Sequence, residues 1–327
     1  MLETLRAGDR VRSGRQPERG IGKVVYADAS SAVVYFKDRT KTVPEARLSE
    51  FRLPTEILEL VPDAPPDAEL EHLPPYSRPS GKHEFKRKKT ELTIKGAQDL
   101  FFRTYPLGFN DPGYFDPIKG EREYKAAANR RYLEAMAAGL PTLTERPQEI
   151  RAAFWRIYDG LDHKAVSPLN VLHPKWEAPR FFDALDDFGW ARRYLSTSLA
   201  FAAECSAATF DALADVMQEM PGLERGLSGR WPYATWFPFI AEPTHHIAIR
   251  LTYIEEFASA ATFDIAYSSE LDFRMYERVC RLAYHLLGDL DVSGLNTSRR
   301  PLDMIDAQSF MWVARRYSEP GFEGSSA

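Results

Sequence analysis

The spacing of hydrophobic residues changes along the chain, and the change divides the chain into two parts. Short apolar or alternating runs near the N-terminus predict strands at 7–12, 20–26 and 32–36, with a fourth around 40–43 and one helical turn at 46–51. A sheet with so few short strands buries a core most readily by closing on itself. The N-terminal pattern therefore predicts a small SH3-like or Tudor-like β-barrel.

From about residue 93 onward, apolar residues recur every three or four positions, which is the period of an amphipathic α-helix. These stripes lie at 94–105, 124–136, 150–161, 210–220, 273–290 and 304–314. Two segments, 246–253 and 261–267, contain alternating or β-branched residues and predict a strand or two inside the helical part. The fold class expected from the whole pattern is α+β.

Residues that break regular structure set the boundaries between these parts. Six prolines and four acidic residues lie between Pro62 and Gly81, a composition typical of an extended spacer. The last ten residues include two glycines and three serines, as expected of a frayed tail. The predicted segments are a barrel at 1–60, a proline-rich linker at 61–81, a mainly α-helical domain at 82–317 and a flexible tail at 318–327.

The formal net charge of −5 hides an uneven distribution of charge. Residues 1–60 carry 11 basic and 9 acidic side chains, residues 81–131 carry 12 and 7, and residues 132–327 carry 18 and 27. An acidic body repels a phosphate backbone, whereas the two mildly basic segments attract it. We therefore expect the N-terminal part to contact nucleic acid, either DNA or RNA.

The candidate nucleic-acid-binding residues are the cations of two barrel loops and of a dense basic run at 82–89. They are Arg12, Arg15, Arg19, Lys37, Arg39, Lys41, Lys82, Lys86, Arg87, Lys88 and Lys89. A run of this density can contact several phosphates, and each contact releases condensed counterions. The alternative interpretation is that these cations form a solvated surface.

Three short segments of the N-terminal part resemble a known family. Residues 8–11 read Gly-Asp-Arg-Val, residues 20–24 read Gly-Ile-Gly-Lys-Val and residues 33–36 read Val-Val-Tyr-Phe. The pattern resembles a short bacterial Tudor-like family of unknown function, and it is similar to the RNA-polymerase-interacting module of CarD and of the transcription-repair coupling factor. The resemblance implies an SH3-like fold, with RNA polymerase as a protein partner at the barrel edge. Residues 12–19 differ from the CarD pattern.

Two segments of the helical part, 230–239 and 301–313, resemble helical domains of restriction-type and phage-defence proteins. The second carries the pattern D-IDxQSF-W, and the resemblance implies a setting in anti-phage defence. In the first segment, Trp231, Tyr233 and Trp236 are interleaved with prolines. They are candidates for an aromatic pocket or base-stacking platform, and the alternative is a rigid buried corner of the core.

The common signature motifs of catalysis do not occur in the sequence, including the phosphate-binding P-loop, GxGxxG, HExxH and GxSxG. The histidines show no helical ligand spacing and two cysteines cannot form a zinc site alone, so we expect no metal and no cofactor. The nearest nuclease-like set is Asp116, or Asp111, with Glu123 and Lys125, which would hold Mg²⁺ and orient water. Helix capping is the alternative role of these residues.

These observations favour a non-enzymatic bacterial adaptor whose barrel and basic run contact nucleic acid and whose helical body binds a protein partner. Two alternatives stay open: a transcription regulator that binds RNA polymerase, and a metal-dependent nuclease that uses Asp116, Glu123 and Lys125. No stretch reaches the about 18 unbroken apolar residues of a membrane span, and Met1–Arg10 shows no apolar signal-peptide core. We therefore expect a cytoplasmic protein with no membrane partner.

Overall fold

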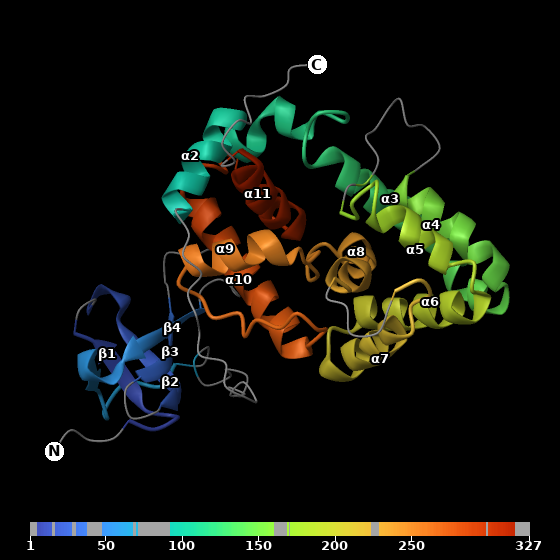
Figure 1. The fold of residues 1–327 in the computed structure, drawn as a ribbon. Helices are drawn as coiled ribbons and strands as arrows, with labels where there is room; N and C mark the ends of the chain where they lie inside the picture. The colour runs from blue at the N-terminus through green and yellow to red at the C-terminus, as the bar shows by residue number, and fades with distance from the viewer. Residues whose placement is uncertain are drawn as a thin grey trace.

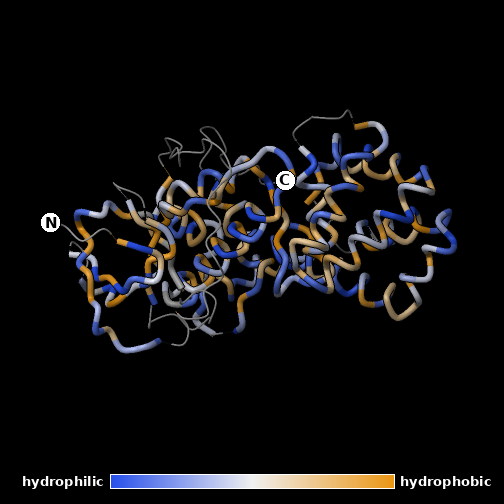
Figure 2. Tube along the Cα trace, turned by 90° about the horizontal axis from the view of Figure 1, so that it is seen from below, coloured by the Kyte–Doolittle hydropathy of each residue, from blue (hydrophilic) through white to orange (hydrophobic). Residues whose placement is uncertain are grey.

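The computed structural model shows an N-terminal β-sheet next to a mainly helical body, as the predicted α+β class requires. The sheet and the helices α3 to α6 lie at opposite ends of the molecule (Figure 1), which is elongated when seen from below (Figure 2). The structure describes residues 5–14, 17–27, 31–37, 48–67, 70, 92–159, 169, 171–223, 229–298 and 300–317.

The sheet is antiparallel and has five strands in the order β4-β3-β2-β1-β5. Its strands are β1 (Arg10–Ser13), β2 (Ile21–Ala27), β3 (Ser31–Lys37), β4 (Leu48–Pro54) and β5 (Leu58–Leu60). The strands predicted at 20–26 and 32–36 are confirmed as β2 and β3. Among the described residues the edge strands are β4 and β5, and these two strands do not pair with each other to close the sheet into a barrel.

The prediction of a helical turn at 46–51 is wrong, because β4 pairs with the whole of β3, from Ser31↔Pro54 to Lys37↔Leu48. The physical reason is that the middle of β3 is buried on both faces, so its backbone needs hydrogen-bond partners on both sides. The fourth strand predicted around 40–43 lies outside the described residues.

A small separate core holds the sheet together. It contains Val11, Val24, Val34, Phe36 and Leu58 from four of the strands. β2 approaches β3 closely at Gly22, where a Cβ atom would lie only 2.8 Å from the carbonyl oxygen of Tyr35. Glycine is therefore required at this position of β2.

Ten α-helices form the body within the described ranges. They are α2 (Ile94–Thr104), α3 (Glu123–Ala137), α4 (Ile150–Tyr158), α5 (Glu177–Ala184), α6 (Phe188–Ala203), α7 (Ala207–Gln218), α8 (Trp231–Ala241), α9 (Leu251–Ala260), α10 (Phe273–Val292) and α11 (Met304–Tyr317). Six of them, α2, α3, α4, α7, α10 and α11, lie where the apolar stripes predict helices. Among these residues, no helix is both long and apolar enough to cross a membrane.

The strands predicted at 246–253 and 261–267 are wrong, because α9 occupies Leu251–Ala260 and neither flank forms a strand. Tyr253, Ile254 and Phe257 are buried together at helical spacing. Before α9, the backbone N–H of Ile249 donates to the Thr235 hydroxyl over 2.9 Å, so a side chain of α8 takes the place of a neighbouring strand.

Helix α8 lies in the middle of the body (Figure 1) and is buried on every side. Such a helix can exist only where other helices surround it. Where the helical body meets the sheet, the guanidinium of Arg281 on α10 donates to the Tyr35 hydroxyl of β3 over 2.7 Å. This contact joins the sheet to the helical body.

Candidate functional site

The nuclease-like residues Asp116, Glu123 and Lys125 each have their own partners. The Asp116 carboxylate accepts the backbone N–H groups of Lys119 at 2.7 Å and Ile118 at 2.9 Å, and these bonds lower its pKa. Glu123 begins α3 and forms an ion pair with Arg130.

Lys125 is the third residue of α3, and its side chain is fully buried. Its ammonium donates to Ser309 at 2.8 Å and to Glu121 at 3.1 Å, and burial lowers its pKa. This arrangement does not support the nuclease interpretation, because the three side chains serve three separate local structures. In the described part of the chain, no group of three His, Cys, Asp or Glu side chains is arranged to hold a metal ion.

The D-IDxQSF-W segment contributes to a network that we call the charge cluster. Its members are Tyr114, Arg122, Arg300, Asp303 and Asp306. Arg122 bridges Asp303 at 2.8 Å and Asp306 at 2.9 Å, while Arg300 and the Tyr114 hydroxyl also donate to Asp306.

Burial opposes ionisation of Asp306, but the hydrogen bonds from Arg300 and the charge of Arg122 outweigh burial and hold its pKa below the usual value. The charge cluster therefore ties the start of α11 to the segment before α3. The D-IDxQSF-W pattern therefore reflects a structural role, which is to link α11 to the segment before α3.

The candidate nucleic-acid-binding cations are only partly within the described residues. Arg12 is exposed on β1, Arg19 stacks over the Phe51 ring at 3.5 Å, and Lys37 pairs with Asp67 at 3.5 Å. The other candidates lie outside the described residues: Arg15, Arg39, Lys41, Lys82, Lys86, Arg87, Lys88 and Lys89. Sequence reasoning also missed one cation, Arg6, which is exposed next to the sheet.

The candidate aromatic pocket lies inside the core. Trp231 and Trp236 are fully buried and Tyr233 is 2% exposed, so no ring face is open to a base. The Tyr194 hydroxyl donates to the Tyr233 carbonyl over 2.8 Å, which fixes α8 against α6. This placement favours the rigid buried corner over the pocket.

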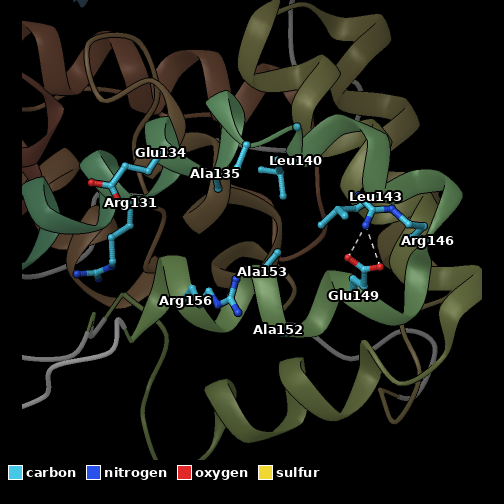
Figure 3. Close-up of a pocket in the computed structure, with 12 residues that line it drawn as sticks. Arg131, Glu134, Ala135, Leu140, Leu143, Arg146, Glu149, Ala152, Ala153 and Arg156 are labelled. Atoms are coloured by element: carbon cyan, nitrogen blue, oxygen red, sulfur yellow. Dashed lines mark hydrogen bonds and ion pairs between the residues drawn. The ribbon is translucent and has the colours of Figure 1, made fainter.

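A surface hollow of about 520 Å³ lies between α3 and α4 (Figure 3). Its floor contains apolar residues such as Leu140 and Leu143. The Arg146–Glu149 ion pair lies at one end and Arg131 with Glu134 at the other (Figure 3). The hollow combines an apolar floor with charged ends, as small-ligand sites do.

A second hollow of about 630 Å³ adjoins the first and shares Ala152 and Arg156 with it. It is also lined by Arg151, Trp155 and Phe188. We call these two adjoining hollows the α4 hollows.

The two aromatic side chains of the second hollow are unusually open to solvent for their size. Trp155 is 44% exposed and Phe188 is 50% exposed. Trp155 is held edge-on by Phe182, with the ring centroids 4.7 Å apart. Phe188 is the first residue of α6, and Asp187 caps this helix by accepting a 2.9 Å hydrogen bond from the backbone N–H of Trp190. Both rings are therefore placed by rigid helices.

The arginines of the α4 hollows differ in how they are paired. One guanidinium nitrogen of Arg146, Nη1, donates to both carboxylate oxygens of Glu149, at 2.8 and 3.0 Å, and Arg151 reaches Asp186 at 3.5 Å. Arg131 donates to the last carbonyl groups of α4. The guanidinium of Arg156 forms no hydrogen bond or ion pair with the described residues.

Sequence reasoning assigned α4 only its core stripe, which includes Phe154 and Ile157. The missed signal was a large aromatic residue off that stripe, because Arg151 and Trp155 lie four residues apart on the opposite face. A tryptophan on the polar face of an amphipathic helix does not point into the core of the protein, so part of its ring stays open to solvent.

A scan against protein-family models finds no match, and searches of curated proteins and of solved structures also find no significant match.

Proposed function

We propose that this protein is a non-enzymatic bacterial adaptor that contacts nucleic acid through its basic N-terminal part and binds a protein partner through its helical body, in the setting of anti-phage defence. The observation that carries the proposal is the segregation of charge. Arg6 and Arg12 are exposed and make no side-chain hydrogen bond or ion pair with the described residues. Cations without carboxylate partners are available to phosphates.

The cations of the acidic body are used differently. Many of them pair with a carboxylate, including Arg193 with Glu219 at 2.7 Å and Arg315 with Glu256 at 3.2 Å. Such pairs neutralise each other and attract a polyanion weakly. The basic run at 82–89 adds five further cations to the N-terminal part.

A protein partner is supported by exposed apolar side chains in the segment between α2 and α3. Leu107 is 60% exposed, Phe115 is 36% exposed and Ile118 is 55% exposed. Apolar side chains that gather on a surface are typical of protein contacts. This segment lies away from the β-sheet (Figure 1), so the sheet and the segment can contact different partners.

The test is fluorescence anisotropy of the full chain with labelled single- and double-stranded DNA and RNA over a salt series. Two variants remove N-terminal cations: Arg6→Ala with Arg12→Ala, and a quadruple change of Lys86, Arg87, Lys88 and Lys89 to Ala. The matched control removes two exposed cations of the acidic body, Lys175→Ala with Arg192→Ala.

We expect the N-terminal variants to weaken binding about tenfold or more at low salt and to flatten the salt dependence, because each lost phosphate contact removes counterion release. The control should bind as the wild type does. Equal affinities for all three variants would contradict the proposal.

RNA polymerase is a second candidate partner, favoured by the edge strands β4 and β5, each of which has one side without a strand partner among the described residues. An open edge can pair with a strand of another protein. The full chain should then co-elute with purified RNA polymerase in the absence of nucleic acid, and separate elution would contradict this candidate.

A further inference from the structure

The α4 hollows bring two open aromatic rings and an arginine without a described partner into one surface. Pockets of about 300 to 1,000 Å³ accept small organic molecules, so hollows of about 520 and 630 Å³ each have room for one nucleotide. Trp155 offers a ring whose edge is already fixed by Phe182. A preorganised ring loses little freedom when a flat ligand stacks on it.

The position of Arg156 links the two hollows, because this side chain lines both. In a single strand, the phosphate lies between two successive bases. A guanidinium that lies between two base-sized hollows is therefore positioned to bind that phosphate. The neighbouring Arg146 and Arg151 already pair with Glu149 and Asp186, so Arg156 supplies the unneutralised charge.

We propose that the α4 hollows bind two consecutive nucleotides of single-stranded nucleic acid, with one base on Trp155 next to Phe188, the next base over Leu140 and Leu143, and the intervening phosphate on Arg156. The inference rests on the proposed nucleic-acid function and places a second contact in the helical body. Base stacking on aromatic side chains together with cationic contacts to the backbone is the general way in which proteins hold single strands.

A duplex does not fit this site, because its bases are stacked on each other and its surface offers only phosphates and groove edges. A single strand can turn a base outward into a hollow. The carboxylates at the rim also disfavour a surface made for phosphates alone, whereas they tolerate bases and their N–H donors. The ligand is therefore expected to be single-stranded DNA or RNA.

The experiment measures binding of the full chain to a labelled single strand of about 12 nucleotides and to a duplex of the same sequence. Trp155→Ala removes the stacking ring, and Trp155→Phe keeps a ring. The matched control is Trp176→Ala, because Trp176 is 71% exposed but stacks on His173 and lines neither hollow. Arg156→Ala and Arg192→Ala form the corresponding arginine pair. Thermal melts confirm that each variant is folded.

We expect Trp155→Ala to weaken single-strand binding about tenfold, Trp155→Phe to restore most of it, and Trp176→Ala to leave it unchanged. Duplex affinity should be the same in all three. If Trp155→Ala and Trp176→Ala bind the single strand equally, the inference is overturned, while the loss of binding in the N-terminal variants still supports the proposed function. If the wild type binds no nucleic acid at low salt, both fail. Binding of a protein at the hollows with unchanged single-strand affinity would also overturn the inference.

Discussion

Two arginine-containing regions of the helical body, the charge cluster and the α4 hollows, differ in what surrounds their charges. In the charge cluster, Asp306 is fully buried and accepts hydrogen bonds from Arg122, Arg300 and Tyr114. In the α4 hollows, the side chain of Arg156 is exposed and forms no hydrogen bond or ion pair with the described residues, and Trp155 is 44% exposed. A buried charge with a full set of partners is committed to the fold, whereas an open and unpaired one is available to a ligand.

Arginine therefore has a structural role in the charge cluster, where the charges are buried and paired. Arg156 has a proposed ligand-binding role in the α4 hollows, where its side chain is exposed and unpaired among the described residues. This difference predicts that substitutions in the charge cluster change the free energy of unfolding, while substitutions in the α4 hollows change ligand affinity.

The largest effect is expected from Asp306→Ala, which leaves Arg122 and Arg300 without their shared carboxylate. Breaking a buried ion pair costs about 3 to 5 kcal/mol, so the free energy of unfolding in urea should fall by that amount. Glu149→Ala is the control, because it breaks an exposed pair with Arg146 and should cost less than about 1 kcal/mol. Equal losses in the two variants would show that the charge cluster stabilises the fold no more than an exposed ion pair does.

A second buried polar group, His246, predicts a pH dependence of stability. Its ring lies 2.7 Å from the Tyr276 hydroxyl, and burial lowers its pKa to about 4. The imidazole of an unfolded chain has a pKa of about 6.5. The neutral ring is therefore favoured in the fold, and stability falls as the pH drops from about 6.5 to about 4, by about 3 kcal/mol in total.

His246→Gln should remove most of this dependence, measured as the urea midpoint between pH 7 and pH 4. The lowered pKa of Asp306 acts in a separate window, because the stability it contributes is present above about 3.9 and is lost below that value. A variant that loses stability as steeply as the wild type over the upper window would contradict the role assigned to His246.

The next effect concerns Trp155→Ala, for which binding and stability should separate. The single-strand affinity should fall about tenfold, while the half-buried ring contributes about 2 kcal/mol to the free energy of unfolding, less than the loss expected of Asp306→Ala. The measurements are anisotropy and urea unfolding on the same protein. A variant that unfolds several kcal/mol more easily and binds normally would place Trp155 with the structural residues.

The smallest effect is a change in the salt dependence of binding. Arg156→Ala should lower the slope of log affinity against log salt concentration by about 0.7, the value for one contact to a single-stranded phosphate. Arg156→Lys should keep the slope, and Arg192→Ala should not change it. A slope that Arg156→Ala leaves unaltered would mean that no phosphate contacts this side chain.

The positions of many helices could be predicted because their apolar residues follow one period. Phe101, Phe154 and Leu287 lie on stripes that the core buries, in α2, α4 and α10. The period does not reveal which distant segments pair. Arg122 and Asp306, for example, are 184 positions apart in the sequence, and nothing local indicates that they share a bond.

The errors have physical causes of the same kind. The residues of β4 look like a helical turn until β3 is known to need a partner on that side. Segment 246–253 alternates like a strand, but Thr235 of α8 satisfies the backbone of Ile249. For the candidate site, Trp155 could have been noticed as an aromatic residue on the polar face of α4. The hollow that it lines also depends on Asp186 and on Phe188 of α6, which one segment cannot show.

The most direct test of the central claim is the affinity of the full chain for a single-stranded oligonucleotide of about 12 nucleotides, measured by anisotropy from about 50 to 300 mM salt. The predicted result is saturable binding at low salt that weakens steeply as salt rises, by more than the one contact at Arg156 explains. Absence of binding at about 50 mM salt would contradict both nucleic-acid contacts and leave the exposed apolar surface near Phe115 as the remaining candidate for function.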